Sequence, residues 1–180
     1  MRKFLILILF LIPSISFSNE SLTNLLKDGK KIVFIRHALA PGNGDPLNFD
    51  LNDCSTQRNL NEKGREQSIN IGNFFKKHKI KIEKVLSSEW CRCKETAKLA
   101  FNDFETFDAL NSFYAERFSI NRPKQINDLK EYINNWQSDS NLIIVTHYVV
   151  IDAILNRGTQ SGEMIISDKN LSLLGSIEIN

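Results

Sequence analysis

Two short apolar stretches, each leading into a histidine, constrain the fold of this chain more than any other feature. Lys31–Ile35 and Asn141–Thr146 are rich in Ile and Val, which is typical of parallel strands that are buried on both faces. Arg36 and His37 come directly after the first stretch, and His147 directly after the second. Because ligands bind at the carboxyl ends of strands in open α/β sheets, we expect both histidines to face one crevice.

The rest of the chain alternates between helical and strand patterns. Asn61 is a predicted N-cap for a helix over residues 62–78, whose apolar face would carry Ile69, Phe74 and Phe75. Further helices are expected over residues 21–27, 89–101, 123–136 and 149–155, further strands over 81–87, 163–167 and 171–179, and a long surface loop over 40–56. This alternation predicts an α/β fold: a single-domain three-layer sandwich over residues 19–180, with a mostly parallel central sheet flanked by helices.

The first 18 residues have the layout of a secretory signal peptide. Two basic residues precede an unbroken apolar run over residues 4–12, Pro13 interrupts it, and Ser16 and Ser18 form a small-x-small cleavage site. The run is too short to span a bilayer comfortably, which makes an uncleaved membrane anchor the less favoured alternative. We therefore expect cleavage after Ser18, a periplasmic or secreted protein, and no stable membrane insertion of the mature chain.

The charge balance excludes a general nucleic-acid binder. The chain has 23 Lys+Arg and 21 Asp+Glu, a formal net charge of +2, and Arg2 and Lys3 of the signal account for that excess. A neutral body lacks the basic face that nucleic acid requires, although it is compatible with a small basic pocket. The expected partner is a small molecule.

The basic residues near the two histidines predict an oxyanion pocket. Arg36, and Arg92 in the helix after the 81–87 strand, would join His37 and His147 in the crevice. Two guanidinium groups and two imidazoles at one point need an anion to be stable, and arginine matches phosphate oxygens bidentately. A neutral imidazole is also a nucleophile, and flanking arginines would stabilise a phosphoryl group in transfer. The sequence has no Asp/His cluster with metal-ligand spacing, so we expect no metal or other cofactor.

Four blocks of this sequence resemble the histidine phosphatase (phosphoglycerate mutase-like) superfamily, in the right order and spacing. The first block resembles the Arg-His-Gly signature of that family, with Ala in place of Gly. The blocks are Arg36-His37-Ala38 and residues 58–65, 87–97 and 145–147.

The resemblance implies a role for each pocket residue. His37 would accept the phosphoryl group and form a phosphohistidine that water later hydrolyses. Arg36, Arg92 and His147 would hold the phosphate, together with Asn43, six residues after His37. The resemblance implies a metal-independent phosphatase that hydrolyses a small phosphomonoester.

The general acid of the family has no clear motif in this sequence. Glu116 is the first candidate and Glu163 the second. The resemblance also implies that relatives acting on phosphoramidates do without this acid. A phosphoramidate or phosphohistidine hydrolase is therefore one alternative function, and a non-catalytic phosphate-binding relative is another.

Several loop segments resemble an exported bacterial subgroup of the superfamily, one member type of which acts on phosphates of lipopolysaccharide core sugars. The resemblance implies a cell-envelope sugar phosphate as the substrate. Phe113, Tyr114 and Phe118 could line the substrate mouth, with packing in the core as the alternative. The segments are Gly44-Asp45-Pro46, Asp53-Cys54, Asn111-Ser112-Phe113 and Asn121-Arg122-Pro123.

Several side chains near the pocket have more than one possible role. A disulfide from Cys54 to Cys91 or Cys93 would tie the 40–56 loop beside the pocket. Zinc binding by Cys91-x-Cys93 and three reduced, buried thiols are the alternatives. Arg58 could reach the pocket or anchor the start of the following helix. Asp45 could hydrogen-bond sugar hydroxyls or bind a cation, but the favoured prediction is an exposed loop residue.

Overall fold

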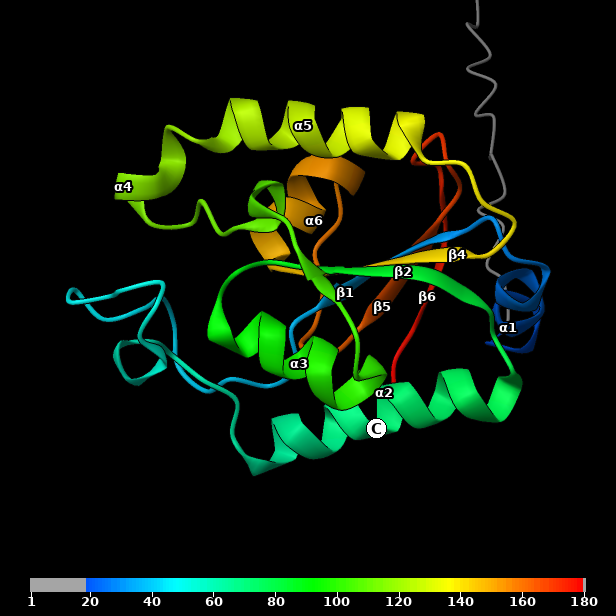
Figure 1. Cartoon of the computed structure of the whole chain (residues 1–180), viewed down its shortest axis with the longest axis horizontal. Helices are drawn as coiled ribbons and strands as arrows, with labels where there is room; N and C mark the ends of the chain where they lie inside the picture. Colours follow the sequence, from blue (N-terminus) through cyan, green and yellow to red (C-terminus); the bar gives the residue numbers. More distant parts are fainter. Residues whose placement is uncertain (1–18, 180) are drawn as a thin grey trace, which may run out of the picture.

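A sheet of six strands runs through the part of the chain that the structure, a computed structural model, describes: residues 19–179 (Figure 1). The strand order is β3-β2-β4-β1-β5-β6. The first four strands are mutually parallel, whereas β5 runs antiparallel to β1 and the edge strand β6 runs antiparallel to β5. The strands are β1 (Ile32–Arg36), β2 (Ile82–Ser87), β3 (Glu105–Thr106), β4 (Asn141–Thr146), β5 (Met164–Ser167) and β6 (Leu173–Ile177).

Helices cover both faces of this sheet (Figure 1). One face carries α1 (Asn19–Asp28), α2 (Glu62–His78) and α3 (Cys91–Phe101), and the other carries α5 (Arg122–Asn135) and α6 (Tyr148–Leu155). The predicted three-layer α/β sandwich with a mostly parallel sheet is thereby confirmed. Short helical turns complete the described chain: η1 (Cys54–Thr56), η2 (Asp108–Leu110) and α4 (Glu116–Ser119).

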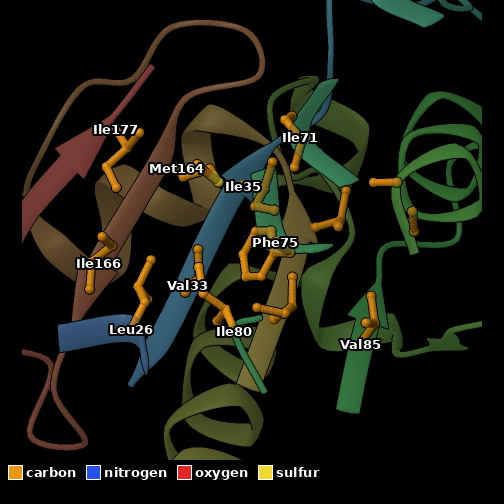
Figure 2. Packing of buried hydrophobic residues seen from close by; sticks show 14 of the residues in the cluster. Leu26, Val33, Ile35, Ile71, Phe75, Ile80, Val85, Met164, Ile166 and Ile177 are labelled. Carbon is orange, nitrogen blue, oxygen red and sulfur yellow. The ribbon is translucent and has the colours of Figure 1, made fainter. Parts of the chain in front are cut away.

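The central strands β1 and β4 carry runs of four apolar residues because they contribute to two cores. Val33 and Ile35 of β1 pack on the side of α1, α2 and α3, in the core shown in Figure 2, while Ile32 and Phe34 pack against α5 and α6. Successive strand residues point to opposite faces, so a strand between two helical layers buries every side chain. Each such aliphatic or aromatic side chain contributes about 1.5–3 kcal/mol by burial.

Helix α2 begins and ends where the sequence predicts, and one residue of its predicted apolar face is wrong. The Asn61 side chain accepts a hydrogen bond from the Gly64 amide at 2.9 Å, as expected of an N-cap. Phe75 is buried and Phe74 packs against the same core, as predicted, but Ile69 is 46% exposed and Ile71 is buried in its place. The reason lies in Gly64, where an added Cβ would lie 2.2 Å from a backbone oxygen. This close approach, to Leu39 in the loop after β1, turns the side of α2 that carries Gly64 and Ile71 inward.

The remaining differences from the predicted elements are short. Helix α3 begins at Cys91 rather than at residue 89, and the turns η1, η2 and α4 and the two-residue strand β3 were not expected. Elements of two to four residues have too little periodicity to be recognised, since neighbouring strands and loops determine them. The predicted signal peptide, residues 1–18, lies outside the described residues. Over residues 19–179, no helix has both the length and the apolar character needed to cross a membrane.

Candidate active site

Three parallel strands end at one edge of the sheet and bring distant side chains together. Arg36 is opposite Thr146 in the β1–β4 register, and the His37 amide donates to the Thr146 carbonyl at 2.9 Å. The start of α3 lies at the same edge. In Figure 1, helix α4 and the loop that follows β1 lie beyond this edge. A small cavity of about 60 Å³ opens there. Its lining includes five of the residues singled out from the sequence: Arg36, His37, Asn43, Arg92 and His147.

His37 is buried, neutral and held in one tautomer. Its Nδ1 lies 2.8 Å from the Ala38 carbonyl oxygen. Because a carbonyl only accepts, Nδ1 carries the hydrogen and Nε2 keeps its lone pair. Burial, followed by the positive charge of Arg92, holds the pKa of His37 well below its usual range. The imidazole therefore has the protonation state that a nucleophile requires.

His147 is also buried and is oriented by the residues behind it. Its Nδ1 lies 3.4 Å from Arg92 Nη2, and since arginine only donates, Nδ1 is the acceptor. Its Nε2 then donates to Ser88 Oγ at 2.9 Å, and the Ser88 hydroxyl donates to Asn111 Oδ1 at 3.1 Å. Burial and Arg92 hold the pKa of His147 well below its usual range. The two imidazole rings are 5.5 Å apart between centroids.

Arginines surround these two imidazoles. Arg36 donates to the Thr159 carbonyl at 2.8 Å, and Arg58 donates to the Gly44 carbonyl at 2.9 Å and lines the cavity. Of the two roles considered for Arg58, the structure therefore supports the pocket. Within the described residues, the Nε groups of Arg36 and Arg92 are buried and have no hydrogen-bond partner. Buried N–H groups are rarely left in this state, and an oxyanion would satisfy both.

Asp45 is not the exposed loop residue that the sequence predicts. Its carboxylate accepts hydrogen bonds from both terminal nitrogens of Arg92, at 2.7 and 3.1 Å. Trp90 Nε1 and the Arg58 amide donate to it as well, each at 3.1 Å. Burial alone would raise the pKa of Asp45, but the hydrogen bonds and charge of Arg92 lower it below its usual value. The expectation fails because converging arginines need a counter-charge, which this loop supplies.

The structure does not bring the general-acid candidates into the cavity. Glu116 is exposed at the first residue of α4 and is not part of the lining. Glu163 is buried elsewhere, where it pairs with Arg157 at 2.7 Å and accepts from the Gln160 amide. Among the described residues that line the cavity, Asp45 is the only one with a carboxylate.

Aromatic side chains form the mouth of the cavity. Tyr114 and Tyr148 have ring centroids 5.8 Å apart, and the Asn43 amide donates to the Tyr114 hydroxyl at 3.1 Å. Phe118 also lines the cavity, but Phe113 is buried in the core beneath α5. Pockets for whole drug-sized ligands measure roughly 300–1,000 Å³. A cavity this small admits one oxyanion, so the remainder of a ligand must lie across the tyrosines.

A disulfide joins Cys54 to Cys91 and ties the loop to the start of α3. Of the alternatives left open by the sequence, zinc binding and three reduced thiols are wrong, because Cys91 is already bonded. Cys93 is free and buried, 3.5 Å from His147 Nε2, and burial raises its pKa to about 12. Gln57, which the sequence did not single out, accepts from the Cys91 amide at 2.9 Å. Over residues 19–179, no group of three His, Cys, Asp or Glu side chains is arranged to hold a metal ion.

Known proteins share this architecture and part of the sequence pattern. Residues 32–118 match the family model of the histidine phosphatase superfamily (branch 1). No curated protein matches the sequence significantly. The fold is similar to that of the protein histidine phosphatase SixA, solved with tungstate, with a TM-score of 0.60 and 15% identity over 82% of this chain and 96% of that one. It is also similar to a phosphoglycerate mutase from Thermus thermophilus, with a TM-score of 0.57 and 14% identity over 83% and 99% of the two chains. Residues 32–118, just under half of the chain, thus match the histidine phosphatase superfamily, and the fold as a whole is similar to those of SixA and the phosphoglycerate mutase.

Proposed function

We propose that this chain is a phosphatase that transfers a phosphoryl group first to His37 and then to water. The observation that carries the proposal is a buried, neutral imidazole whose Nδ1 is held by the Ala38 carbonyl, in a cavity lined by arginines. His37 Nε2 would form a bond to phosphorus while the bond to the leaving group breaks. Water would then attack the phosphohistidine, the P–N bond would break, and inorganic phosphate would leave the neutral imidazole.

The arginines and His147 would stabilise the transferring group. Charge on its equatorial oxygens would meet Arg36, Arg58 and Arg92. Preorganised donors of this kind stabilise such charge by several kcal/mol in a site closed to water. The Nε groups of Arg36 and Arg92 would gain the partners that they lack. A phosphate dianion beside Nδ1 of His147 would favour protonation of that ring and turn it into a further donor.

A labelling experiment tests the nucleophile. We expect rapid quenching during turnover of a ³²P-labelled phosphomonoester to leave label on the wild-type protein and none on the His37→Ala variant. The rate should fall by about a thousandfold or more, as when other catalytic nucleophiles are removed. His78→Ala is the control, because His78 ends α2 outside the cavity. Turnover without label on the wild type, or label kept by His37→Ala, would contradict the proposal.

A second candidate substrate class is the phosphoramidates, including phosphohistidine. The observation in its favour is that Asp45, the sole carboxylate in the described lining, already accepts four N–H donors and has no proton to give. An alkoxide leaving group needs a proton, whereas a nitrogen leaving group can take one from solvent before the P–N bond breaks. Comparing kcat/KM for a phosphoramidate with that for a sugar phosphate separates the two classes.

Two further parts of the proposal concern the substrate, a cell-envelope sugar phosphate, and the export of the protein. A cell-envelope sugar phosphate is supported by the loop segments that resemble the exported subgroup and by Tyr114 and Tyr148 at the mouth, against which a sugar ring can pack. Export is supported by the layout of residues 1–18 and by the Cys54–Cys91 disulfide, which oxidising compartments permit. Cell fractionation tests export: deletion of residues 2–18 should leave the protein in the cytoplasm.

A further inference from the structure

Asp45 lies in the middle of the candidate site, yet it cannot serve as its acid or base. Oδ1 accepts from Arg92 Nη1 and from the Arg58 amide, and Oδ2 accepts from Arg92 Nη2 and from Trp90 Nε1. An ionised carboxylate offers about four acceptor positions, so all of them are in use. A group whose lone pairs are all engaged neither carries nor collects a proton during turnover.

The contacts of Asp45 determine which donor Arg92 has left for a ligand. Nη1 of Arg92 also donates to the Arg58 carbonyl at 3.3 Å, and Nη2 faces His147 Nδ1 at 3.4 Å. The four hydrogens on the terminal nitrogens are therefore engaged. The Nε–H of Arg92 is buried without a partner, as is the Nε–H of Arg36. Both arginines line the same cavity, so one oxyanion can satisfy both donors.

Asp45 also adjusts the charge that a phosphate meets. The arginines whose charges act on both buried histidines are Arg36, Arg58 and Arg92. With one carboxylate among three guanidinium groups and two neutral imidazoles, this set around the histidines has a net charge of +2, and the exposed Arg117 adds a fourth guanidinium group to the lining. A phosphate dianion balances that charge. Without Asp45 the set would be +3, and the product phosphate would be held more tightly.

We propose that Asp45 is a positioning residue of the phosphoryl site, which keeps its bidentate pair with Arg92 during turnover and directs Arg92 Nε–H at the substrate phosphate. The inference rests on the proposed function, since it assumes that the cavity receives a phosphoryl group. The opposite reading is that the carboxylate occupies the phosphate position and must leave before the substrate binds. The two readings differ in where Asp45 lies once an oxyanion is bound.

A crystal structure of the wild-type protein with tungstate decides between them. We expect the Asp45–Arg92 pair to be intact and a tungstate oxygen to lie within hydrogen-bond distance of Arg92 Nε. A carboxylate displaced from Arg92, with tungstate on the two terminal nitrogens, would overturn this inference and leave the proposed function standing. Absence of tungstate binding would overturn both.

Kinetics of Asp45→Asn provide a second test with a readout that a purely structural role would not give. We expect kcat to fall by about tenfold or more, because a loosened Arg92 misplaces the phosphoryl group. The inhibition constant for inorganic phosphate should stay the same or fall, because the site gains positive charge. Asp53→Asn is the matched control: Asp53 lies on the same loop, and its side chain accepts from the Ser55 amide, a cap that asparagine can also provide. An unchanged or higher kcat in Asp45→Asn would overturn the inference, and the wild-type tungstate structure still decides if that variant does not fold.

Discussion

At the scale of single residues, the candidate site depends on the pair of hydrogen bonds between the Asp45 carboxylate and Arg92. Two histidines and an arginine at strand ends were enough to predict a crevice that needs an anion, because the chemistry of those side chains is local. The anion that the structure supplies is the Asp45 carboxylate, 47 positions away from Arg92 along the chain. Nothing in the turn Gly44-Asp45-Pro46 shows the direction in which its side chain points, so the pair could not be predicted.

Buried neutral histidines make stability depend on pH in a definite direction. The pKa values of His37 and His147 are held well below the usual range by burial and by Arg92. The unfolded chain, with ordinary histidines, takes up protons as the pH falls through about 6.5, while the folded protein does not. We therefore expect the free energy of unfolding to fall as the pH drops below about 6.5, and to be regained as the pH rises again.

Urea unfolding between pH 7.5 and 5.5 measures this dependence. The His37→Gln variant should show a shallower fall in stability with decreasing pH than the wild type. His78→Gln, which changes a histidine at the end of α2, is the control. A wild-type protein whose stability is the same at both pH values, or a variant with an unchanged slope, would contradict the buried neutral state.

At the scale of elements, the accuracy of prediction follows the strength of local signals. Helix α2 was predicted to the residue because Asn61 caps its start, and Lys79, with a φ of 54°, ends it. Strand β4 was recognised from the apolar residues of its sequence, and all six of its residues are buried. The long loop after β1 was expected to be functional, but its shape depends on distant partners: Arg58 donates to the carbonyls of Ala40 and Gly44, and Cys54 is bonded to Cys91.

The disulfide between that loop and α3 should contribute strongly to stability. Cys54 and Cys91 are 37 positions apart, and closing a loop of this length in the unfolded chain is worth about 3–4 kcal/mol. We expect the Cys54→Ser, Cys91→Ser double variant to lose about this much free energy of unfolding in urea titrations. The loop that carries Asp45 would be less well fixed, so tungstate binding should also weaken.

Reductant provides the control for the double variant. Dithiothreitol should destabilise the wild-type protein and leave the double variant unaffected. A thiol assay in denaturant should count one free thiol per wild-type chain before reduction, that of Cys93, and three afterwards. Equal stability of the two proteins without reductant would contradict a stabilising disulfide.

At the scale of the whole molecule, the candidate site exists only when the sheet is assembled. Arg36 and His37 follow from β1, Arg92 belongs to α3, and His147 follows β4. β4 lies between β1 and β2 in the sheet, although it comes after both in the chain. The alternating pattern predicted a mostly parallel sheet, since strands joined through helices pair in parallel, but it did not predict this strand order. The unfolded chain has no such pocket, so an oxyanion binds the folded state alone.

Binding should therefore raise the melting temperature by an amount set by affinity. At a ligand concentration of 100 times Kd, the folded state gains about 2.7 kcal/mol. For a domain of this size, 1 kcal/mol corresponds to a shift of about 2–4 °C, so tungstate should raise Tm by about 5–10 °C. The measurement is a thermal scan with increasing tungstate, against sodium chloride of equal ionic strength. The Arg92→Ala variant should lose most of the Tm shift, measured against the same variant without tungstate. The control is Arg65→Ala, which removes a partly exposed arginine paired with Glu95 on the surface and should keep the shift. An equal shift in both variants would mean that tungstate binds elsewhere on the molecule.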